Sequence, residues 1–248
     1  MVEWAVICEA AGDYAVVTRI ADRLAEVEVP WAAGILENLR RWRGLEPAAD
    51  FTTWPTLKRL CQERGLRVLG HRGRGQEAGA RLMVRRVFNL LAVADDLPRS
   101  DGVLLVHDRD KLDDDAVWFE TWEDLDAVVL FVRAVPIPEI EAWFIVMFDP
   151  REEAEVAALA SVTKEIGHDP RQVAHTLNPG RTHTQDGQPV LRSTKRILDA
   201  LMPNEDRERR WERIVAAPFD QMEARGVEVG LAAFVRELRE RYLPSLGR

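Results

Sequence analysis

The sequence predicts an α/β protein with a parallel β-sheet, helices on both faces of that sheet and a C-terminal helical extension. Residues 4–8 and 103–106 are unbroken apolar runs, which are typical of strands buried on both faces. Helical patterns alternate with strands up to about residue 150, and only helical patterns follow. We therefore expect an α/β domain over residues 1–150 and a helical extension over residues 151–248 that packs on it.

The expected elements follow from apolar periodicity and from the positions of Pro and Gly. A turn after the first strand leads into a helix that carries Ile20, Leu24 and Val27 on one face. Pro138 is placed to begin a later helix. Strands are predicted at 4–8, 66–69, 103–106 and 127–132, and further helices at 31–43, after Pro55, through 82–91, and at 139–148, 152–159, 192–201, 207–217 and 231–242.

Composition excludes several classes of protein. The formal net charge of the 248-residue chain is -8, so any contact with nucleic acid must come from a local basic patch. The two cysteines, Cys8 and Cys61, predict no disulfide framework and are typical of a reducing cytoplasm. No apolar stretch approaches the roughly 20 residues that a membrane span requires, and the N-terminus does not read as a signal peptide. We expect a cytoplasmic protein without a membrane segment.

Acidic residues follow two of the predicted strands. Glu9 comes directly after the first, and Asp108 and Asp110 follow the third. Ligands of open parallel sheets bind at the carboxyl ends of the strands, and residues i and i+2 of an extended chain project to the same side. Hard carboxylate oxygens suit Mg²⁺ or Mn²⁺. These acids therefore predict a metal site, although acids at strand ends also serve as turn formers and helix caps, and Asp13 is well placed as such an N-cap.

The residues around these acids resemble a known domain. The segments 6–13 (Val-Ile-Cys-Glu-Ala-Ala-Gly-Asp) and 103–110 (Val-Leu-Leu-Val-His-Asp-Arg-Asp) resemble the Toprim domain of topoisomerases, bacterial primases and OLD-type nucleases. The resemblance implies that Glu9, Asp108 and Asp110 are metal-site acids. In topoisomerases and primases the glutamate acts as a general acid or base. One departure is Ala10, which stands where the family usually has glycine.

A third segment extends the resemblance to about the first 150 residues. Residues 135–143 (Val-Pro-Ile-Pro-Glu-Ile-Glu-Ala-Trp) are similar to the start of a helix in small stand-alone Toprim proteins of the RloB-like kind, found among bacterial defence and mobile-element genes. Glu141 is a further candidate metal ligand by this resemblance. As alternatives, Glu139 and Glu141 are acids of a first helical turn that favour the helix dipole, and Trp143 is a core residue.

Basic residues supply candidate contacts to nucleic acid. A Gly/Arg-rich loop is expected at residues 71–75, and its Arg72 and Arg74 are candidates to hold a phosphate backbone. Lys195 begins a helix after a polar loop and is a candidate to reach a phosphate at the rim of the sheet. The arginines that follow residue 80 are interpreted as a solvated helix face with salt bridges.

Two functions are compatible with these features. The first is a Mg²⁺- or Mn²⁺-dependent Toprim nuclease that cleaves DNA or RNA in bacterial antiviral defence, a role implied by the resemblance alone. The alternative is a non-catalytic Toprim-like binding or regulatory subunit of a multi-component defence system. Partners implied by the resemblance are nucleic acid and a protein, such as an ATPase, of the same operon.

Overall fold

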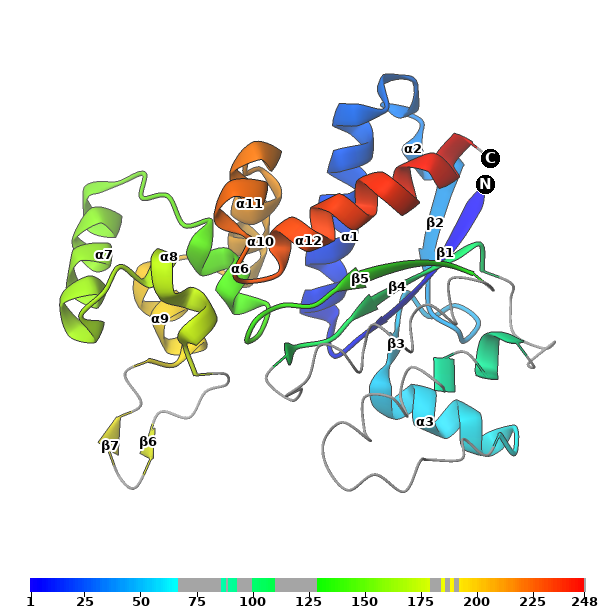
Figure 1. The fold of residues 1–248 in the computed structure, drawn as a ribbon, viewed down its shortest axis with the longest axis horizontal. Coiled ribbons are helices and arrows are strands. Elements are labelled where there is room, and N and C mark those ends of the chain that lie inside the picture. The colour runs from blue at the N-terminus through cyan, green and yellow to red at the C-terminus, as the bar shows by residue number, and fades with distance from the viewer. Residues whose placement is uncertain are drawn as a thin grey trace. The chain divides into compact units, whose positions relative to one another are not determined.

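The computed structural model describes residues 1–66, 86–87, 89–92, 100–109, 129–178, 184–185, 188–189 and 192–247 (Figure 1). The described residues form two compact units. The first comprises the chain up to His107, residues 129–134 and residues 237–247. The second comprises Asp108, Arg109 and the described residues of 135–236.

A parallel sheet forms the centre of the first unit. Its strand order is β2-β1-β4-β5, and β3 pairs with the last residues of β1. Each of these pairings is parallel. The strands are β1 (Val2–Cys8), β2 (Arg40–Arg43), β3 (Thr52–Thr53), β4 (Gly102–Val106) and β5 (Leu130–Ala134). The predicted α/β class and parallel sheet are confirmed; residues 67–69, where another strand is predicted, lie outside the described residues.

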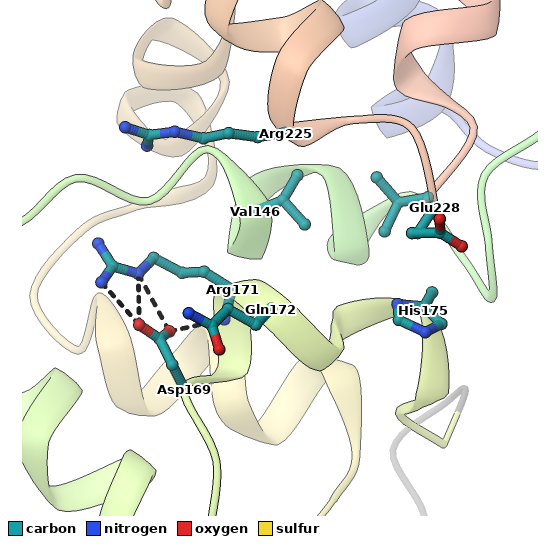
Figure 2. A pocket seen from close by; sticks show the side chains of 8 residues that line it. Val146, Asp169, Arg171, Gln172, His175, Arg225 and Glu228 are labelled. Atoms are coloured by element: carbon teal, nitrogen blue, oxygen red, sulfur yellow. Dashed lines mark hydrogen bonds and ion pairs between the residues drawn. The ribbon is translucent and has the colours of Figure 1, made fainter.

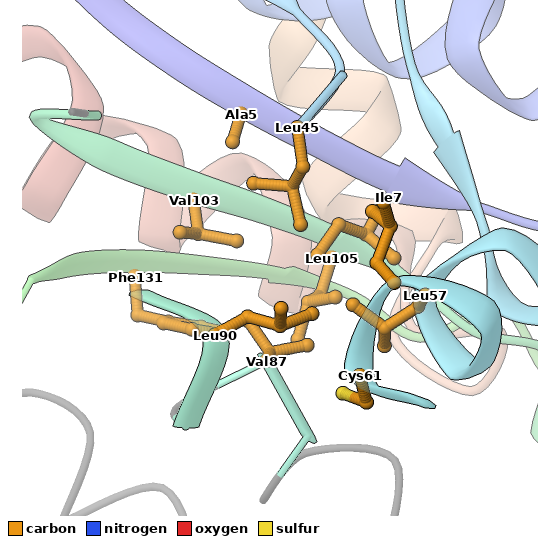
Figure 3. Close-up of a cluster of buried hydrophobic side chains, with 11 residues drawn as sticks. Ala5, Ile7, Leu45, Leu57, Cys61, Val87, Leu90, Val103, Leu105 and Phe131 are labelled. Carbon is orange, nitrogen blue, oxygen red and sulfur yellow. The ribbon is translucent and has the colours of Figure 1, made fainter. Parts of the chain in front are cut away.

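Helices cover both faces of this sheet, as predicted (Figure 1). On one face, α1 (Ala11–Glu28) buries Val16, Ile20 and Leu24, which recur every four residues. On the other face, strand side chains such as Ile7 and Leu105 pack in one cluster with residues of α3 (Trp54–Glu63) and with Val87 and Leu90 (Figure 3). The alternation of side chains along each buried strand therefore supplies two separate apolar layers.

The start of α1 differs in detail from the prediction. Ala10 is the N-cap, and Asp13 lies in the first helical turn, where its carboxylate accepts a hydrogen bond of 2.9 Å from the Ala10 N–H. Asp13 thus caps the helix from inside its first turn and is not the N-cap residue itself.

The helix predicted over residues 31–43 is wrong in its second half. A 3-10 turn, η1 (Pro30–Ala32), and a short helix, α2 (Leu36–Leu39), lead directly into strand β2. Trp42 explains the change, because its indole N–H donates to Asp22 over 2.9 Å and its ring stacks on Tyr242 with centroids 5.2 Å apart. The partner ring lies 200 residues away in the sequence, so local periodicity could not reveal it.

The C-terminal segment completes the core of the first unit. It consists of a π-helical turn, η4 (Leu238–Tyr242), and a 3-10 helix, η5 (Leu243–Gly247). Tyr242 meets Trp4 edge to face at 5.5 Å, and the Trp4 indole N–H donates to Ser245 Oγ over 3.3 Å. The Trp4 ring in turn lies over Gly102, where a Cβ would come within 2.6 Å of it. Residues 237–247 therefore belong to the first compact unit. The predicted boundary after residue 150 places them in the helical extension instead.

The same C-terminal segment also covers β5, the last strand in the order of the described strands. Glu237 accepts a hydrogen bond of 2.7 Å from the backbone N–H of Arg133 and pairs with the Arg133 guanidinium. Four residues later, Arg241 donates to the Phe131 carbonyl over 3.3 Å. Side chains therefore take the backbone groups that an edge strand otherwise presents to another chain.

The second unit is mainly helical. Trp143 is fully buried in it: its indole N–H donates to the Val229 carbonyl over 2.6 Å, and its ring stacks on Phe234. Trp143 is therefore a core residue, as one of the sequence interpretations held. The described elements are α6 (Glu141–Val146), α7 (Glu153–Ile166), α8 (Pro170–Val173), η3 (Ala174–Thr176), β6 (Thr184–Gln185), β7 (Gln188–Pro189), α9 (Thr194–Leu201), α10 (Arg207–Val215), α11 (Phe219–Arg225) and the start of α12 (Leu231–Glu237).

The capping of β5 leads to a stability prediction. Glu237→Gln should lower the free energy of unfolding by about 2 kcal/mol, because an amide cannot accept hydrogen bonds from both the backbone and the guanidinium as a carboxylate does. Glu240→Gln, an exposed change on the same segment, should stay within about 0.5 kcal/mol of wild type. Equal losses for the two variants in urea denaturation would contradict the capping role.

Candidate functional site

Strands β1, β4 and β5 end at the same edge of the sheet. The register pairs Ile7 with Leu105, and Val106 with Ala134. If the pairing of Ile7 with Leu105 is extended by two residues, Glu9 comes level with His107. His107 is the residue before Asp108. The sheet therefore brings the ends of the two acid-bearing strands side by side, which is the arrangement on which the metal-site prediction depends.

Glu9 lies in a turn that alanine fits without strain. Ala10 has an extended backbone (φ -149°, ψ 166°), a conformation open to any residue. Alanine in place of the glycine that is usual in Toprim domains therefore does not distort the turn. The preceding Cys8 thiol donates to the Ala10 carbonyl over 3.3 Å, and burial, with the charge of Asp13, raises the pKa of Cys8 to about 12. Cys8 is consequently a protonated thiol near neutral pH, not a nucleophile.

Asp108 belongs to the second unit. The next residue, Arg109, donates its backbone N–H to the Pro136 carbonyl over 2.9 Å, which continues the hydrogen bonding beyond β4. Oδ1 of Asp108 is shielded from solvent. Asp110 lies outside the described residues, and Glu9 belongs to the first unit, so the convergence of Glu9, Asp108 and Asp110 stays a prediction.

A lysine–carboxylate cluster lies in the second unit. The Lys195 Nζ is 3.2 Å from Glu139 Oε2 and 3.7 Å from Glu141 Oε1. The Thr194 hydroxyl donates to Glu139, and the Thr194 backbone N–H donates to the Asn178 carbonyl over 3.0 Å. Thr194 and Lys195 therefore connect the start of α9 to Glu139, in the segment that leads into α6.

The charges of this cluster favour the ammonium form of Lys195. Partial burial lowers the pKa of Lys195, but the carboxylates of Glu141 and Glu139, with a weaker contribution from Asp108, outweigh it and leave the pKa raised. Lys195 is thus positively charged near neutral pH beside Glu139 and Glu141. Such a charge offsets the cost of holding Glu139 out of water, since only 3% of Glu139 is exposed.

These contacts refine the sequence predictions. Glu141 is in the first turn of α6, as expected, whereas Glu139 precedes the helix and is buried against Thr194, so its role as a first-turn acid is wrong. Lys195 was predicted to contact phosphate and is here paired with two acids. No local pattern reveals this pairing, because it joins residues more than fifty positions apart.

Other predictions concern the basic loop, a metal site and membrane segments. Arg72 and Arg74 lie outside the described residues. Among the residues that the structure describes, no group of three or more His, Cys, Asp or Glu side chains is arranged to hold a metal ion. Within the same residues, no helix combines the length and apolarity needed to cross a membrane.

Comparison of the chain with protein-family models, with curated proteins and with solved structures finds no match. The fold itself defines the class: this is an α/β protein with a mostly parallel sheet, in which acidic residues follow two neighbouring strands.

The lysine–carboxylate cluster predicts a measurable stability contribution. Lys195→Met keeps the length of the side chain but leaves Glu139 and Glu141 without the ammonium, and should lower the free energy of unfolding by about 1–3 kcal/mol. Adding Glu139→Gln should restore part of this loss. Lys164→Met, an exposed change on α7, is the matched control. A loss no larger than that of the control would show that the cluster does not stabilise the fold.

The pH dependence of this contribution follows from the direction of the Lys195 shift. A pKa raised in the folded state gives stability that is fully present below the unfolded lysine value of about 10.4 and is lost as pH rises through the folded pKa. The difference in unfolding free energy between wild type and Lys195→Met should therefore be constant from pH 7 to 9 and shrink above about pH 10.4. A difference that falls between pH 7 and 9 in urea denaturation would contradict the raised pKa.

Proposed function

We propose that this protein is a Toprim-like nuclease that cleaves phosphodiester bonds of DNA or RNA with the help of Mg²⁺ or Mn²⁺, in bacterial antiviral defence. One observation supports it most: two adjacent parallel strands, β1 and β4, end side by side and are followed within two residues by Glu9 and Asp108. The resemblance of these segments to Toprim domains assigns the chemistry.

In this proposal the acids hold the metal. Glu9, Asp108 and Asp110 are the ligands, with Glu141 as a further candidate, and Glu9 also acts as the general base or acid. Such an ion polarises a phosphoryl oxygen and lowers the pKa of a bound water. The chemistry of the donors fits, because carboxylate oxygens are the ligands that Mg²⁺ and Mn²⁺ prefer.

Lys195 has a defined part in the same proposal. An ammonium has three N–H donors, and two carboxylates within 3.7 Å hold Lys195 in place. In the proposal, Lys195 contributes this fixed positive charge to phosphate binding, and Arg72 and Arg74 contribute theirs. The pairing with Glu139 and Glu141 therefore positions Lys195 and does not remove it from a role in phosphate binding.

The alternative is a non-catalytic Toprim-like subunit that binds a ligand or a partner protein, such as an ATPase, and regulates it. One observation favours it: Lys195 already pairs with Glu139 and with Glu141, which is a candidate metal ligand. Ala10, which stands where Toprim domains usually have glycine, does not favour this alternative, because its extended backbone leaves the turn after β1 unstrained.

The two functions differ in their response to removal of the acids. Glu9→Gln and Asp108→Asn should each abolish Mn²⁺-dependent cleavage, by about a hundredfold or more, because each removes a ligand of the ion that activates water. Binding of nucleic acid should survive both changes. The assay uses purified protein with labelled single- and double-stranded DNA and with tRNA, with and without Mn²⁺.

Two exposed changes serve as controls for this assay. Glu37→Gln in α2 and Asp220→Asn in the first turn of α11 remove the same charges from exposed residues that are not part of the proposed site, and should leave cleavage unchanged. Cleavage that persists in Glu9→Gln and Asp108→Asn would refute the assigned site. A wild-type protein that cuts none of the substrates, alone or with the products of neighbouring genes, would favour the regulatory subunit.

Nucleic-acid binding itself tests the basic loop. Arg72→Ala combined with Arg74→Ala should weaken binding and flatten its salt dependence, reducing the slope of log K against log salt by about 1–2, because fewer phosphate contacts release fewer counterions. Arg236→Ala, an exposed arginine of α12, is the matched control. An unchanged slope in a fluorescence-anisotropy titration would remove this loop from the interface.

A further inference from the structure

The second unit contains a surface cavity that is separate from the lysine–carboxylate cluster. Its volume is about 480 Å³, within the range of cavities that bind small molecules. Its lining comes from α6, α8, η3, the end of α11 and the loop before α12 (Figure 2). Elements far apart in the sequence thus contribute to one concave surface.

One end of the cavity is cationic. Figure 2 shows the side chains of Arg171 and Arg225 extending toward the same side. Arg171 is held by Asp169, with Nη2 2.7 Å from Oδ2, and these hydrogen bonds lower the pKa of the Asp169 carboxyl. The Arg225 guanidinium has no hydrogen bond or ion pair within the described part of the chain. Arg171 is held in place and the Arg225 guanidinium is available to a ligand. Together they suit a phosphate, whose oxygens can accept hydrogen bonds from both guanidinium groups.

The other end presents hydrogen-bonding groups of a different kind. Glu228 and His175 lie there, across Val146 from the guanidinium of Arg225 (Figure 2). Neither the Glu228 carboxylate nor the His175 ring is bonded to another described side chain. Val146 and Val229 line the cavity between these ends, and both are almost fully buried. The cavity therefore has an anion-binding end and, opposite it, an end with groups that accept hydrogen bonds.

The separation of the two ends limits the class of ligand. The ammonium and carboxylate of an amino acid are attached to one carbon atom, so they cannot serve Glu228 and Arg225 at opposite ends. In a nucleotide, the phosphate and the polar edge of the base lie at opposite ends of the molecule, with an apolar ring face beside that edge. We propose that this cavity is a binding site for a nucleoside monophosphate, with the phosphate on Arg225 and Arg171 and the polar edge of the base at Glu228 and His175.

The Glu228 carboxylate determines which bases the cavity binds most tightly. A carboxylate accepts hydrogen bonds and donates none. Guanine offers it two adjacent N–H donors, and adenine and cytosine each offer an amino group. Uracil flanks its single N–H with two carbonyl oxygens, which the carboxylate repels. The site therefore prefers GMP and discriminates most strongly against UMP.

Isothermal titration calorimetry of the whole protein with GMP, AMP, CMP, UMP, inorganic phosphate and glycine tests the proposal. GMP should bind most tightly, and phosphate and glycine more weakly than every nucleotide except UMP. Arg225→Gln should weaken GMP binding about tenfold or more, since it removes a charge-assisted contact. Glu228→Gln should reduce the preference for GMP over UMP. Both changes are on exposed residues, and thermal melts confirm that the variants fold.

Two matched variants separate the site from general charge effects. Arg236→Gln and Glu212→Gln lie on other exposed surfaces of the second unit and should leave GMP binding as in wild type. The proposal is overturned if no nucleotide binds at millimolar concentration, or if Arg225→Gln binds GMP as wild type does. It is also overturned if glycine or phosphate binds as tightly as GMP, or if the controls weaken binding equally.

Discussion

The parallel pairing of β1 with β4 is the constraint on which the first unit depends. Both strands are buried along the paired residues, and the register fixes Ile7 opposite Leu105 and Trp4 opposite Gly102. This register gives Trp4 its place over a residue without a side chain, and Tyr242 packs against the Trp4 ring. It also places the carboxyl ends of the two strands together, so the same interaction that organises the core brings Glu9 level with His107, the residue before Asp108.

Much of this sheet could be predicted from the sequence because its central strands are unbroken apolar runs. Such runs identify β1 and β4 without any knowledge of their neighbours. β2 could not be found in this way, since Arg40–Arg43 is short and carries three arginines, and only Trp42 shows which way it is buried. Its burial depends on Asp22 and Tyr242, which come from other elements. The return of the C-terminus to the first unit escaped prediction for the same reason.

In the candidate site, too, some residues could be predicted from the sequence and others could not. Glu9 and Asp108 could be predicted because each follows a recognisable strand, and parallel topology then determines the edge on which they lie. The role of Glu139 could not, because its burial depends on Thr194 and Lys195 in a helix that begins 55 positions later. Lys195 could be recognised as a basic residue at a helix start, but not as the partner of two acids. The cavity at Arg225 and Glu228 likewise has no sequence signal, since its lining comes from separate elements.

The central claim is that carboxylates after β1 and β4 share one divalent ion. Crystals soaked in Mn²⁺ test it most directly, through the anomalous signal of the metal. The account predicts a peak at about 2.2 Å from carboxylate oxygens of Glu9, Asp108 and Asp110, and its loss in crystals of Asp108→Asn. An ordered Glu9 carboxylate remote from both aspartates, with no peak between them, would contradict the account.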